Sequence, residues 1–197
     1  MCGSADKLFS GLTFSLIIVS DRSYRGERED RTGPALKKYL EERGGKVRET
    51  AVVPDEIDWL KKKLVSLCDQ ENSPEVILTA GGTGLGPRDV TPEATKKIID
   101  REVPGLAEAM RQQSFRSTPA AILSRAVAGT RKKTLIINLP GSPKGARENL
   151  EVIAASLPHA VEILRSKITD CAESAIKSGW YQPKESREPK KKNSKNS

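Results

Sequence analysis

Three aspartates and two glycine-rich turns lie just beyond short apolar stretches of the sequence. The aspartates are Asp21, Asp55 and Asp89, and the turns begin at Gly81 (GGTGLGP) and Pro140 (PGSPKG). Consecutive glycines let backbone N–H groups approach an anion without obstruction by side chains. An aspartate beside such a turn suits a cation, such as Mg²⁺, that is shared with a phosphate group. Together these residues predict a site for phosphorylated ligands.

The loop Gly81-Gly82-Thr83-Gly84 is the most specific of these features, although it matches neither common nucleotide-binding motif. A Walker A loop requires GxxxxGK[ST], which the chain lacks. A dinucleotide-binding fingerprint requires a glycine where this sequence has Pro87. The loop therefore indicates either a phosphate-binding turn or a plain structural turn, and a nicotinamide-dependent oxidoreductase is disfavoured.

The acidic residues have structural alternatives of differing weight. Asp55 stands where a helix N-cap is expected and could serve that purpose alone. Asp21 and Asp30 could stabilise turns rather than contact a ligand. Asp89 has no evident structural duty, because Thr91 already occupies the expected cap of the next helix. The basic side chains that could offset phosphate charge are Arg88, Arg125 and Lys144.

Covalent catalysis and metal–thiolate chemistry are both disfavoured. His159 is the only histidine and lies within a predicted helix, so Ser124 and Ser142 lack an evident activating base. The three cysteines are far apart and form no CxxC pair, which argues against zinc and iron–sulfur sites. What remains is catalysis by positioning and charge neutralisation, as phosphoryl and nucleotidyl transfer require.

The elements that must position these residues follow from the hydrophobic pattern. Strands are expected over residues 14–20, 46–53, 76–79 and 134–139. Helices are expected over residues 32–43, 57–67, 91–101, 106–113, 120–128 and 146–164, and Thr32 is the expected N-cap of the first. This alternation predicts an α/β fold, a three-layer, doubly wound, mostly parallel sheet with helices on both faces. Ligands bind such sheets beyond the carboxyl ends of the strands, which is where the aspartates and glycine turns would converge.

The two ends of the 197-residue chain are expected to lie outside this domain. Residues 180–197 contain no aliphatic side chain and carry six Lys or Arg and two Glu, a net +4 of the chain's formal +8. We expect a flexible N-terminus over 1–12, one α/β domain over 13–179 and a disordered basic tail over 180–197. The mild charge of the domain and the 4% aromatic content disfavour nucleic-acid binding. Sparse cysteines, together with the lack of a signal peptide or a membrane-length apolar run, predict a cytoplasmic protein without membrane contact.

Several segments of the predicted domain closely resemble the motifs of the molybdopterin-binding family. The longest are VILTAGGTGLGPRDVTPEA from Val76 and TLIINLPGSPKG from Thr134. The shorter ones are IIVSDR from Ile17, EDRTGP from Glu29, VVPDE from Val52, PGLAEAMR from Pro104 and AILSRAVAG from Ala121. They extend over residues 14–165, and within the family the chain is most similar to the stand-alone adenylyltransferases.

The resemblance implies an activity and a role for each candidate residue. The implied reaction is the ATP- and Mg²⁺-dependent adenylylation of molybdopterin by a homotrimeric nucleotidyltransferase. A downstream molybdenum-insertion protein is a candidate recipient of the product. Asp55 and Asp89 match the acids of the family that are expected to be catalytic and to hold Mg²⁺. The residues implied in binding molybdopterin and ATP are Ser20, Asp21, Asp30, Gly81, Gly82, Thr83, Gly84, Ser124, Pro140, Gly141, Ser142 and Lys144.

Two alternatives stay open at this stage. A member of the same family could bind molybdopterin or handle the cofactor without catalysing adenylylation, although the pair Asp55 and Asp89 favours an enzyme. A protein of another class could use the basic tail to bind a scaffold or nucleic acid. Removal of the residues beyond Gly179 distinguishes the enzyme from this second alternative, because an enzyme would keep its activity and a tail-dependent binder would lose its binding.

Overall fold

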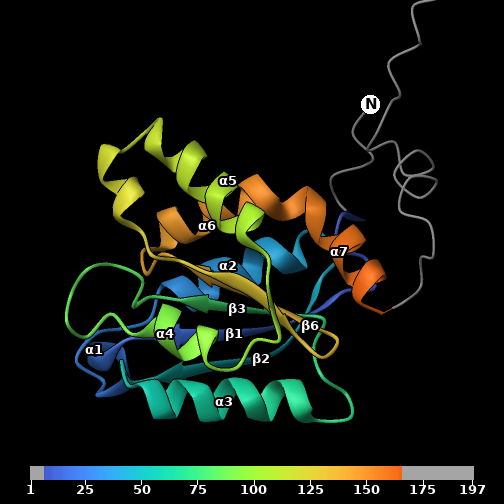
Figure 1. Ribbon diagram of the computed structural model, residues 1–197, viewed down its shortest axis with the longest axis horizontal. Coiled ribbons are helices and arrows are strands. Elements are labelled where there is room, and N and C mark those ends of the chain that lie inside the picture. Colours follow the sequence, from blue (N-terminus) through green and yellow to red (C-terminus); the bar gives the residue numbers. More distant parts are fainter. Residues whose placement is uncertain (1–6, 166–197) are drawn as a thin grey trace, which may run out of the picture.

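A six-stranded sheet with the order β2-β1-β3-β6-β5-β4 forms the centre of the fold (Figure 1). The computed structural model describes residues 7–165. Four strands are mutually parallel: β2 (Lys46–Val53), β1 (Thr13–Val19), β3 (Val76–Ala80) and β6 (Thr134–Leu139). At the far edge β5 (Ala128–Arg131) pairs antiparallel to β6, and β4 (Arg101–Glu102) pairs antiparallel to β5. The predicted, mostly parallel sheet is therefore confirmed.

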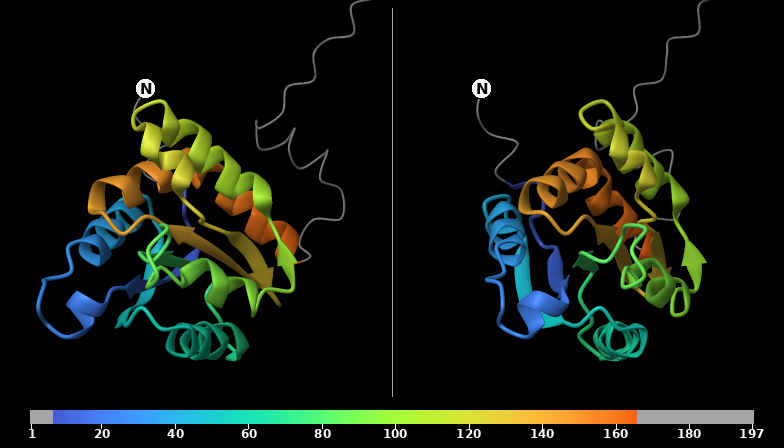
Figure 2. Two further views of the ribbon diagram at one scale, coloured as in Figure 1. Left: turned by 60° about the vertical axis from the view of Figure 1, so that its left-hand side comes forward. Right: turned by 90° about the vertical axis from the view of Figure 1, so that its left-hand side faces the viewer.

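Helices cover both faces of this sheet, as predicted (Figures 1 and 2). One face carries α3 (Ile57–Asp69) and α4 (Thr91–Lys96). The other face carries α2 (Thr32–Glu41), α5 (Pro104–Phe115), α6 (Pro143–Ile153) and α7 (Leu157–Leu164). The short helix α1 (Asp21–Tyr24) follows β1 directly. No helix within residues 7–165 is long and apolar enough to cross a membrane.

The central strands are apolar on both sides because each side faces a helical layer. Successive side chains of a strand point to opposite faces of the sheet. Leu16 and Leu78 accordingly join the cluster beneath α2 and α6, whereas Ile17 and Ile77 join the cluster beneath α3 and α4. All four side chains have zero solvent exposure. The continuous apolar runs in the sequence therefore correspond to strands that are buried on two faces.

Two of the predicted helices are wrong. Residues 120–128 form a short 3-10 helix, η2 (Pro119–Leu123), followed by extended chain that enters β5. Pairing of β5 with β6 overrides the helical propensity of the alanines and leucine, and a Cβ at Gly129 would lie 2.8 Å from the Arg101 carbonyl oxygen. The single helix predicted over 146–164 is instead α6 and α7 with the 3-10 turn η3 (Ala154–Ser156) between them. Pro158 prevents one continuous helix because it cannot donate a backbone hydrogen bond.

The beginning of the domain also differs from the prediction. Residues 7–12, which the sequence analysis assigns to a flexible N-terminus, form a turn that packs on the core. Phe9 is fully buried, with its ring 5.3 Å from the ring of Phe14 and 6.3 Å from that of Tyr39. The Phe9 N–H also donates a hydrogen bond of 2.8 Å to the Arg43 carbonyl oxygen. The predicted basic tail, 180–197, lies outside the described residues.

Candidate active site

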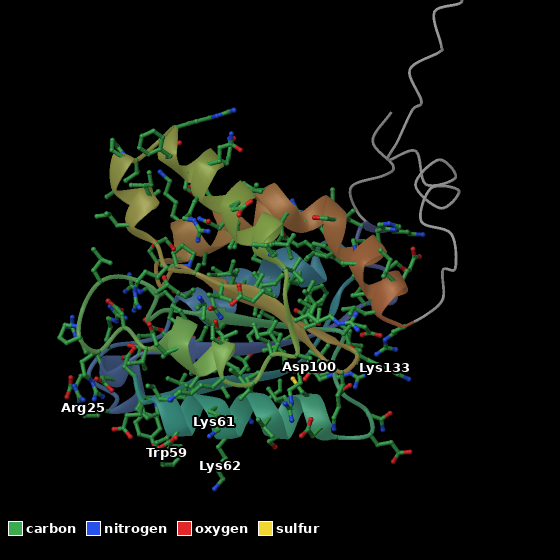
Figure 3. The ribbon with its side chains drawn as sticks, viewed as in Figure 1. Arg25, Trp59, Lys61, Lys62, Asp100 and Lys133 are labelled. Atoms are coloured by element: carbon green, nitrogen blue, oxygen red, sulfur yellow. The ribbon has the colours of Figure 1, made fainter. Side chains whose placement is uncertain are left out.

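The carboxyl ends of the four parallel strands bring the predicted site residues to one edge of the sheet. In Figure 3 this is the end at which Arg25 is labelled, opposite the end with Asp100 and Lys133. A cavity of about 560 Å³ lies there, and a second cavity of about 370 Å³ adjoins it. Ser142 lines both cavities. The predicted convergence of the strand ends therefore produces two connected depressions.

The two cavities divide the predicted residues between them. The predicted residues that line the first cavity are Ser20, Asp30, Asp55, Gly81, Gly82, Gly141 and Ser142. Those that line the second are Thr83, Gly84, Ser124, Pro140 and Ser142. Asp21, Asp89 and Lys144 line neither. Lys144 is 86% exposed and lies 3.8 Å from Glu148, which lines the second cavity.

Gly81 and Gly82 turn the chain sharply after β3. Both have positive φ angles, +113° and +61°, which favour glycine, and a Cβ at Gly81 would overlap the Val19 carbonyl oxygen. The Gly81 N–H donates to the Leu139 carbonyl oxygen at 3.1 Å. Thr91 fixes the other side, because its hydroxyl donates to the Gly81 carbonyl oxygen at 2.8 Å and its N–H donates to that of Gly82 at 3.0 Å. Thr91 is thus the first residue of α4 and a support of the turn, not the predicted helix cap.

Asp21 and Asp55 form a reciprocal pair across the ends of β1 and β2. The Asp21 N–H donates to Asp55 Oδ2 at 2.7 Å, and the Asp55 N–H donates to Asp21 Oδ1 at 3.0 Å. The prediction that Asp55 caps the next helix is wrong, because α3 begins at Ile57 after Glu56 with no side-chain cap. Its carboxylate instead accepts the hydrogen bond from the Asp21 N–H at the ends of the two strands, beside the first cavity.

The charges around this pair act in opposite directions on its two carboxyl groups. Burial raises the pKa of Asp55 above its usual value, and the nearby charges of Asp21 and Asp89 raise it further, although the hydrogen bond from the Asp21 N–H lowers it. Hydrogen bonds from Arg88 lower the pKa of Asp21. Arg88 Nε lies 3.0 Å from Asp21 Oδ2, and Arg88 Nη2 lies 2.9 Å from Oδ1. Arg88, a candidate for phosphate binding, therefore neutralises Asp21 in this structure.

Asp89 has a structural duty that the sequence analysis did not assign to it, and Asp30 stabilises a turn, which was its expected structural alternative. Asp89 Oδ2 accepts the Gly86 N–H at 2.7 Å and so closes the loop that follows the glycine turn. Asp30 Oδ1 accepts the N–H groups of Thr32, at 2.8 Å, and Gly33, at 3.0 Å. Asp30 therefore stabilises the first turn of α2, where Thr32 was predicted to be the cap. The Thr32 hydroxyl instead donates to the Gly141 carbonyl oxygen at 2.8 Å, which closes one wall of the first cavity.

Ser142 and Ser124 lie at the edges of the second cavity. Ser142 caps α6, because its hydroxyl oxygen accepts the Gly145 N–H at 3.2 Å. The positive end of that helix therefore faces the junction of the two cavities. Ser124 Oγ lies 3.4 Å from the Ala126 N–H. His159 is a partly buried residue of α7, as predicted, and lines neither cavity.

Several lining residues were not predicted as site residues. Arg28, Arg31 and Ser23 line the first cavity, and an Arg28 guanidinium nitrogen donates to Ser20 Oγ at 3.3 Å. The second cavity is lined by Arg111 and Asn149 together with several hydroxyl side chains. Arg28 immediately precedes the EDRTGP segment and Arg31 lies within it, so that motif was the available signal. Asn149 lies in the interior of α6, and its sequence context gave no comparable signal.

Comparison with known proteins identifies the family of the chain. Residues 15–159 match the family described as a probable molybdopterin binding domain. The molybdopterin adenylyltransferase of Helicobacter pylori strain J99 is 40% identical over 172 residues, which cover 86% of this chain and 96% of that protein. The enzyme of the same name from Escherichia coli K12 is 38% identical over 190 residues, 89% of this chain and 96% of that protein.

Solved structures show the same relationship. The crystal structure of the molybdopterin biosynthesis enzyme MoaB from Thermus thermophilus matches with a TM-score of 0.75 and 50% sequence identity. The match covers 81% of this chain and 99% of that one. The fold and the length of the matched region thus agree, and the chain belongs to the family of molybdopterin-binding domains.

Proposed function

We propose that the protein is a molybdopterin adenylyltransferase that uses ATP and Mg²⁺. The observation that carries this proposal is the pair of adjoining cavities that share Ser142 and the glycine loop. Gly81 and Gly82 line the first cavity, and Thr83 and Gly84 line the second. Two phosphorylated substrates can therefore approach the same loop from opposite sides, as a transfer between them requires. The adenylyltransferase relatives, which match over most of their length, support the same function.

The sizes of the cavities support an assignment of the substrates. The larger cavity, with Asp30, Asp55 and the basic side chains Arg28 and Arg31, suits the triphosphate and nucleoside of ATP. The smaller cavity, with several hydroxyl side chains and the amide of Asn149, suits the polar ring system of the pterin. The phosphates of both substrates would then meet between Gly82 and Thr83, beside the N-terminus of α6.

The acidic groups fit a magnesium ion that phosphates help to hold. Within residues 7–165, no group of three or more His, Cys, Asp or Glu side chains could hold a metal by itself. Mg²⁺ bound with a nucleotide needs only one or two carboxylates, because phosphate and water oxygens complete its shell. Asp55 Oδ2 accepts the Asp21 N–H, which leaves Oδ1 directed toward Gly82 at the cavity wall. A bound cation would also offset the like charges that raise the pKa of Asp55. Asp55, with Asp89 close by, would hold the ion, which would screen the triphosphate charge.

The reaction that we propose is a direct displacement at phosphorus. An oxygen of the terminal molybdopterin phosphate attacks the α-phosphorus of ATP, the bond from that phosphorus to the bridging oxygen breaks, and pyrophosphate leaves. The protein contributes orientation and charge: N–H groups of the glycine loop bind phosphate oxygens, and the arginines of the first cavity balance the negative charge. No covalent intermediate with the protein is required.

The test is pyrophosphate release from ATP, measured with and without molybdopterin and with and without Mg²⁺. We expect release that requires both additions. Asp89→Asn retains an oxygen that can accept the Gly86 N–H but removes the charge. We expect it to lower the rate by about a hundredfold or more, as loss of an electrostatic group in a site does. Asp58→Asn, on the exposed first turn of α3, is the matched control and should match the wild type.

Two results would overturn the assignment. Release of pyrophosphate without molybdopterin would indicate another acceptor. Binding of molybdopterin without any release would indicate the alternative, a family member that binds or carries molybdopterin without adenylylating it.

Three further properties belong to the same proposal. We expect a homotrimer, so light scattering should give a mass near three times the 21.5 kDa of one chain. The exposed apolar side chains of Phe115, Ile122 and Leu123 near η2 are compatible with contact between subunits. A cytoplasmic location and transfer of the product to a molybdenum-insertion protein complete the expected role. Cell fractionation tests the location, and co-purification with such a protein tests the transfer.

A further inference from the structure

Arg125 makes more contacts with the glycine loop than any role in charge neutralisation would require. Its backbone N–H donates to the Thr83 carbonyl oxygen at 2.9 Å. Its guanidinium group donates from Nε to the Gly84 carbonyl oxygen at 2.7 Å, from Nη2 to the Asp89 carbonyl oxygen and from Nη1 to the Glu93 carboxylate. All three guanidinium nitrogens are therefore bound to protein groups, which leaves little capacity for a substrate phosphate.

These contacts join segments that are distant in sequence. Arg125 lies between η2 and β5, next to Ser124 of the second cavity. Gly84 and Asp89 bound the segment 84–89 within the loop that precedes α4, and Glu93 is in the first turn of α4. The planar guanidinium fork can hold several acceptors in a fixed arrangement at once, which an ammonium group cannot do. Arg125 thereby fixes the span of this loop and its distance from the segment that carries Ser124.

The glycine loop is thus supported in two independent halves. Gly81 and Gly82 are held by Thr91 and by the Leu139 carbonyl oxygen, as described above. Thr83 and Gly84 are held by Arg125. The first half lines the first cavity and the second half lines the second cavity. Loss of one support should therefore disturb one cavity more than the other.

Arg125 also determines the direction of the loop N–H groups. In a planar trans peptide, the C=O and the N–H of the following residue point in opposite directions. The carbonyl groups of Thr83 and Gly84 point toward Arg125. The N–H groups of Gly84 and Leu85 must consequently face away from it, which keeps them available to an anion.

We infer that Arg125 is a positioning residue for the molybdopterin side of the site. Its side chain acts through the Gly84 peptide group, without contacting the reacting atoms, and the Asp89 carboxylate keeps its own hydrogen bond from the Gly86 N–H. This inference rests on the proposed function for its substrates, but the structural part can be tested without them. Arg125→Ala should increase amide hydrogen exchange in residues 83–90 by about tenfold or more, because it releases both ends of the loop. Exchange in β1 and α3 should remain unchanged.

The functional test compares three variants by calorimetric binding and steady-state kinetics. Arg125→Ala should raise the Kd for molybdopterin and lower kcat by about tenfold to a hundredfold each, while the Kd for ATP stays within about threefold of the wild type. Arg125→Lys should give values of Kd and kcat between those of the wild type and Arg125→Ala, because one ammonium group can replace only part of the guanidinium fork. Thr91→Val removes the support of the other half and should show the opposite bias, with the larger loss in ATP affinity.

Arg131→Ala is the matched control for a general loss of stability. Arg131 likewise joins a carboxylate, that of Asp69, to a backbone carbonyl group, that of Ile98, but lies at the other end of the sheet. It should lower the melting temperature without changing either Kd. Equal loss of both affinities in Arg125→Ala, or unchanged exchange in residues 83–90, would overturn the inference. A wild-type protein that fails to adenylylate molybdopterin would refute the proposed function instead, and the exchange experiment would still decide the role of Arg125.

Discussion

At the scale of single residues, Asp55 shows how the site retains a carboxylate in an unfavourable position. Its burial and the like charges of Asp21 and Asp89 raise its pKa, so ionisation of this group opposes folding. The hydrogen bond from the Asp21 N–H and the charge of Arg88 offset only part of this increase in pKa. Functional sites commonly hold such groups at the expense of stability.

Asp55→Asn should therefore separate stability from activity. The amide oxygen can still accept the Asp21 N–H, but the charge disappears. Because the pKa of folded Asp55 lies above that of the unfolded chain, ionisation weakens the wild type as the pH rises through this range. We expect the variant to melt at a temperature equal to or above that of the wild type at neutral pH, and to lose this advantage below the ordinary aspartate pKa of 3.8.

Activity should change in the opposite sense. We expect adenylylation by Asp55→Asn to fall by about a hundredfold or more, since the group that would hold Mg²⁺ has lost its charge. Thermal melts at several pH values, together with pyrophosphate release, measure both effects. A variant that is less stable at neutral pH would show that the carboxylate is mainly structural.

At the scale of elements, the turn after β3 depends on a backbone conformation that only glycine provides. Gly81 combines a φ of +113° with a position against the Val19 carbonyl oxygen. Gly11 also has a positive φ, +79°, but a Cβ there would have open space around it. The two glycines therefore differ in steric environment while sharing the unusual conformation.

Gly81→Ala should destabilise the protein by about 3 kcal/mol or more, because backbone strain and steric overlap add. Gly11→Ala should lower stability by only about 1 kcal/mol, from strain alone. Urea unfolding of both variants measures the difference. Similar values for the two would mean that the turn relaxes easily, and the proposed rigid anion-binding loop would then be wrong.

The sequence predicted elements best where local and tertiary preferences agree. The buried strands and the glycine turn carry their own signals, namely continuous apolar residues and conformations that require glycine. The antiparallel strand β5 lacks such a signal, because its pairing with β6 is a tertiary effect. Asn138 gave no warning either: it lies in an apolar strand, and its Nδ2 donates at 2.9 Å to the hydroxyls of Thr79 and Thr95.

The candidate site could likewise be predicted only in part. Which residues gather at the strand ends could be predicted, since parallel strands place their carboxyl ends together. Their partners could not, because hydrogen bonds such as Thr91 to Gly81 or Arg125 to Gly84 join positions far apart in the chain. The predicted caps were therefore wrong at Thr32, Asp55 and Thr91, where each side chain is used in a tertiary contact.

At the scale of the whole molecule, the end of the sheet opposite the site is held by an ionic cluster. Asp69, the last residue of α3, accepts two hydrogen bonds from Arg131, at 3.1 and 2.9 Å, and lies 3.0 Å from the Lys132 ammonium group. Asp100, labelled at this end in Figure 3, accepts the Lys132 N–H at 2.7 Å. The cluster connects α3 to the turn between β5 and β6 across the edge of the fold.

This cluster should make stability depend on pH under acidic conditions. Hydrogen bonds from Arg131 and then Lys132 lower the pKa of Asp69 from 3.8 to about 2. A lowered pKa stabilises the fold above the unfolded value, and this stabilisation is lost as the pH falls from 3.8 to about 2. Asp69→Asn should thus be less stable than the wild type at neutral pH and equally stable near the lower limit. Urea unfolding at pH values across this range tests whether the stabilities of the variant and the wild type converge. Glu71→Gln is the control for simple loss of a nearby charge.

The thiol of Cys68 offers a probe of opening of the whole domain. Cys68 is 2% exposed in the core between α3 and the sheet, and burial raises its pKa to about 11. A protonated, buried thiol reacts slowly with disulfide reagents, because the thiolate is the reactive form. In a Cys2→Ser, Cys171→Ser background, we expect Cys68 to react at least about a thousandfold more slowly in the folded protein than in urea.

If that slow reaction requires global unfolding, ligands of the folded state must slow it further. ATP with Mg²⁺ should reduce the labelling rate by the factor one plus the ratio of ligand concentration to Kd, since only the folded state binds it. The Kd obtained in this way should agree with the calorimetric value for the same protein. A labelling rate that ATP does not change would mean that α3 opens locally while the site stays intact. The two ends of the sheet would then unfold as separate units.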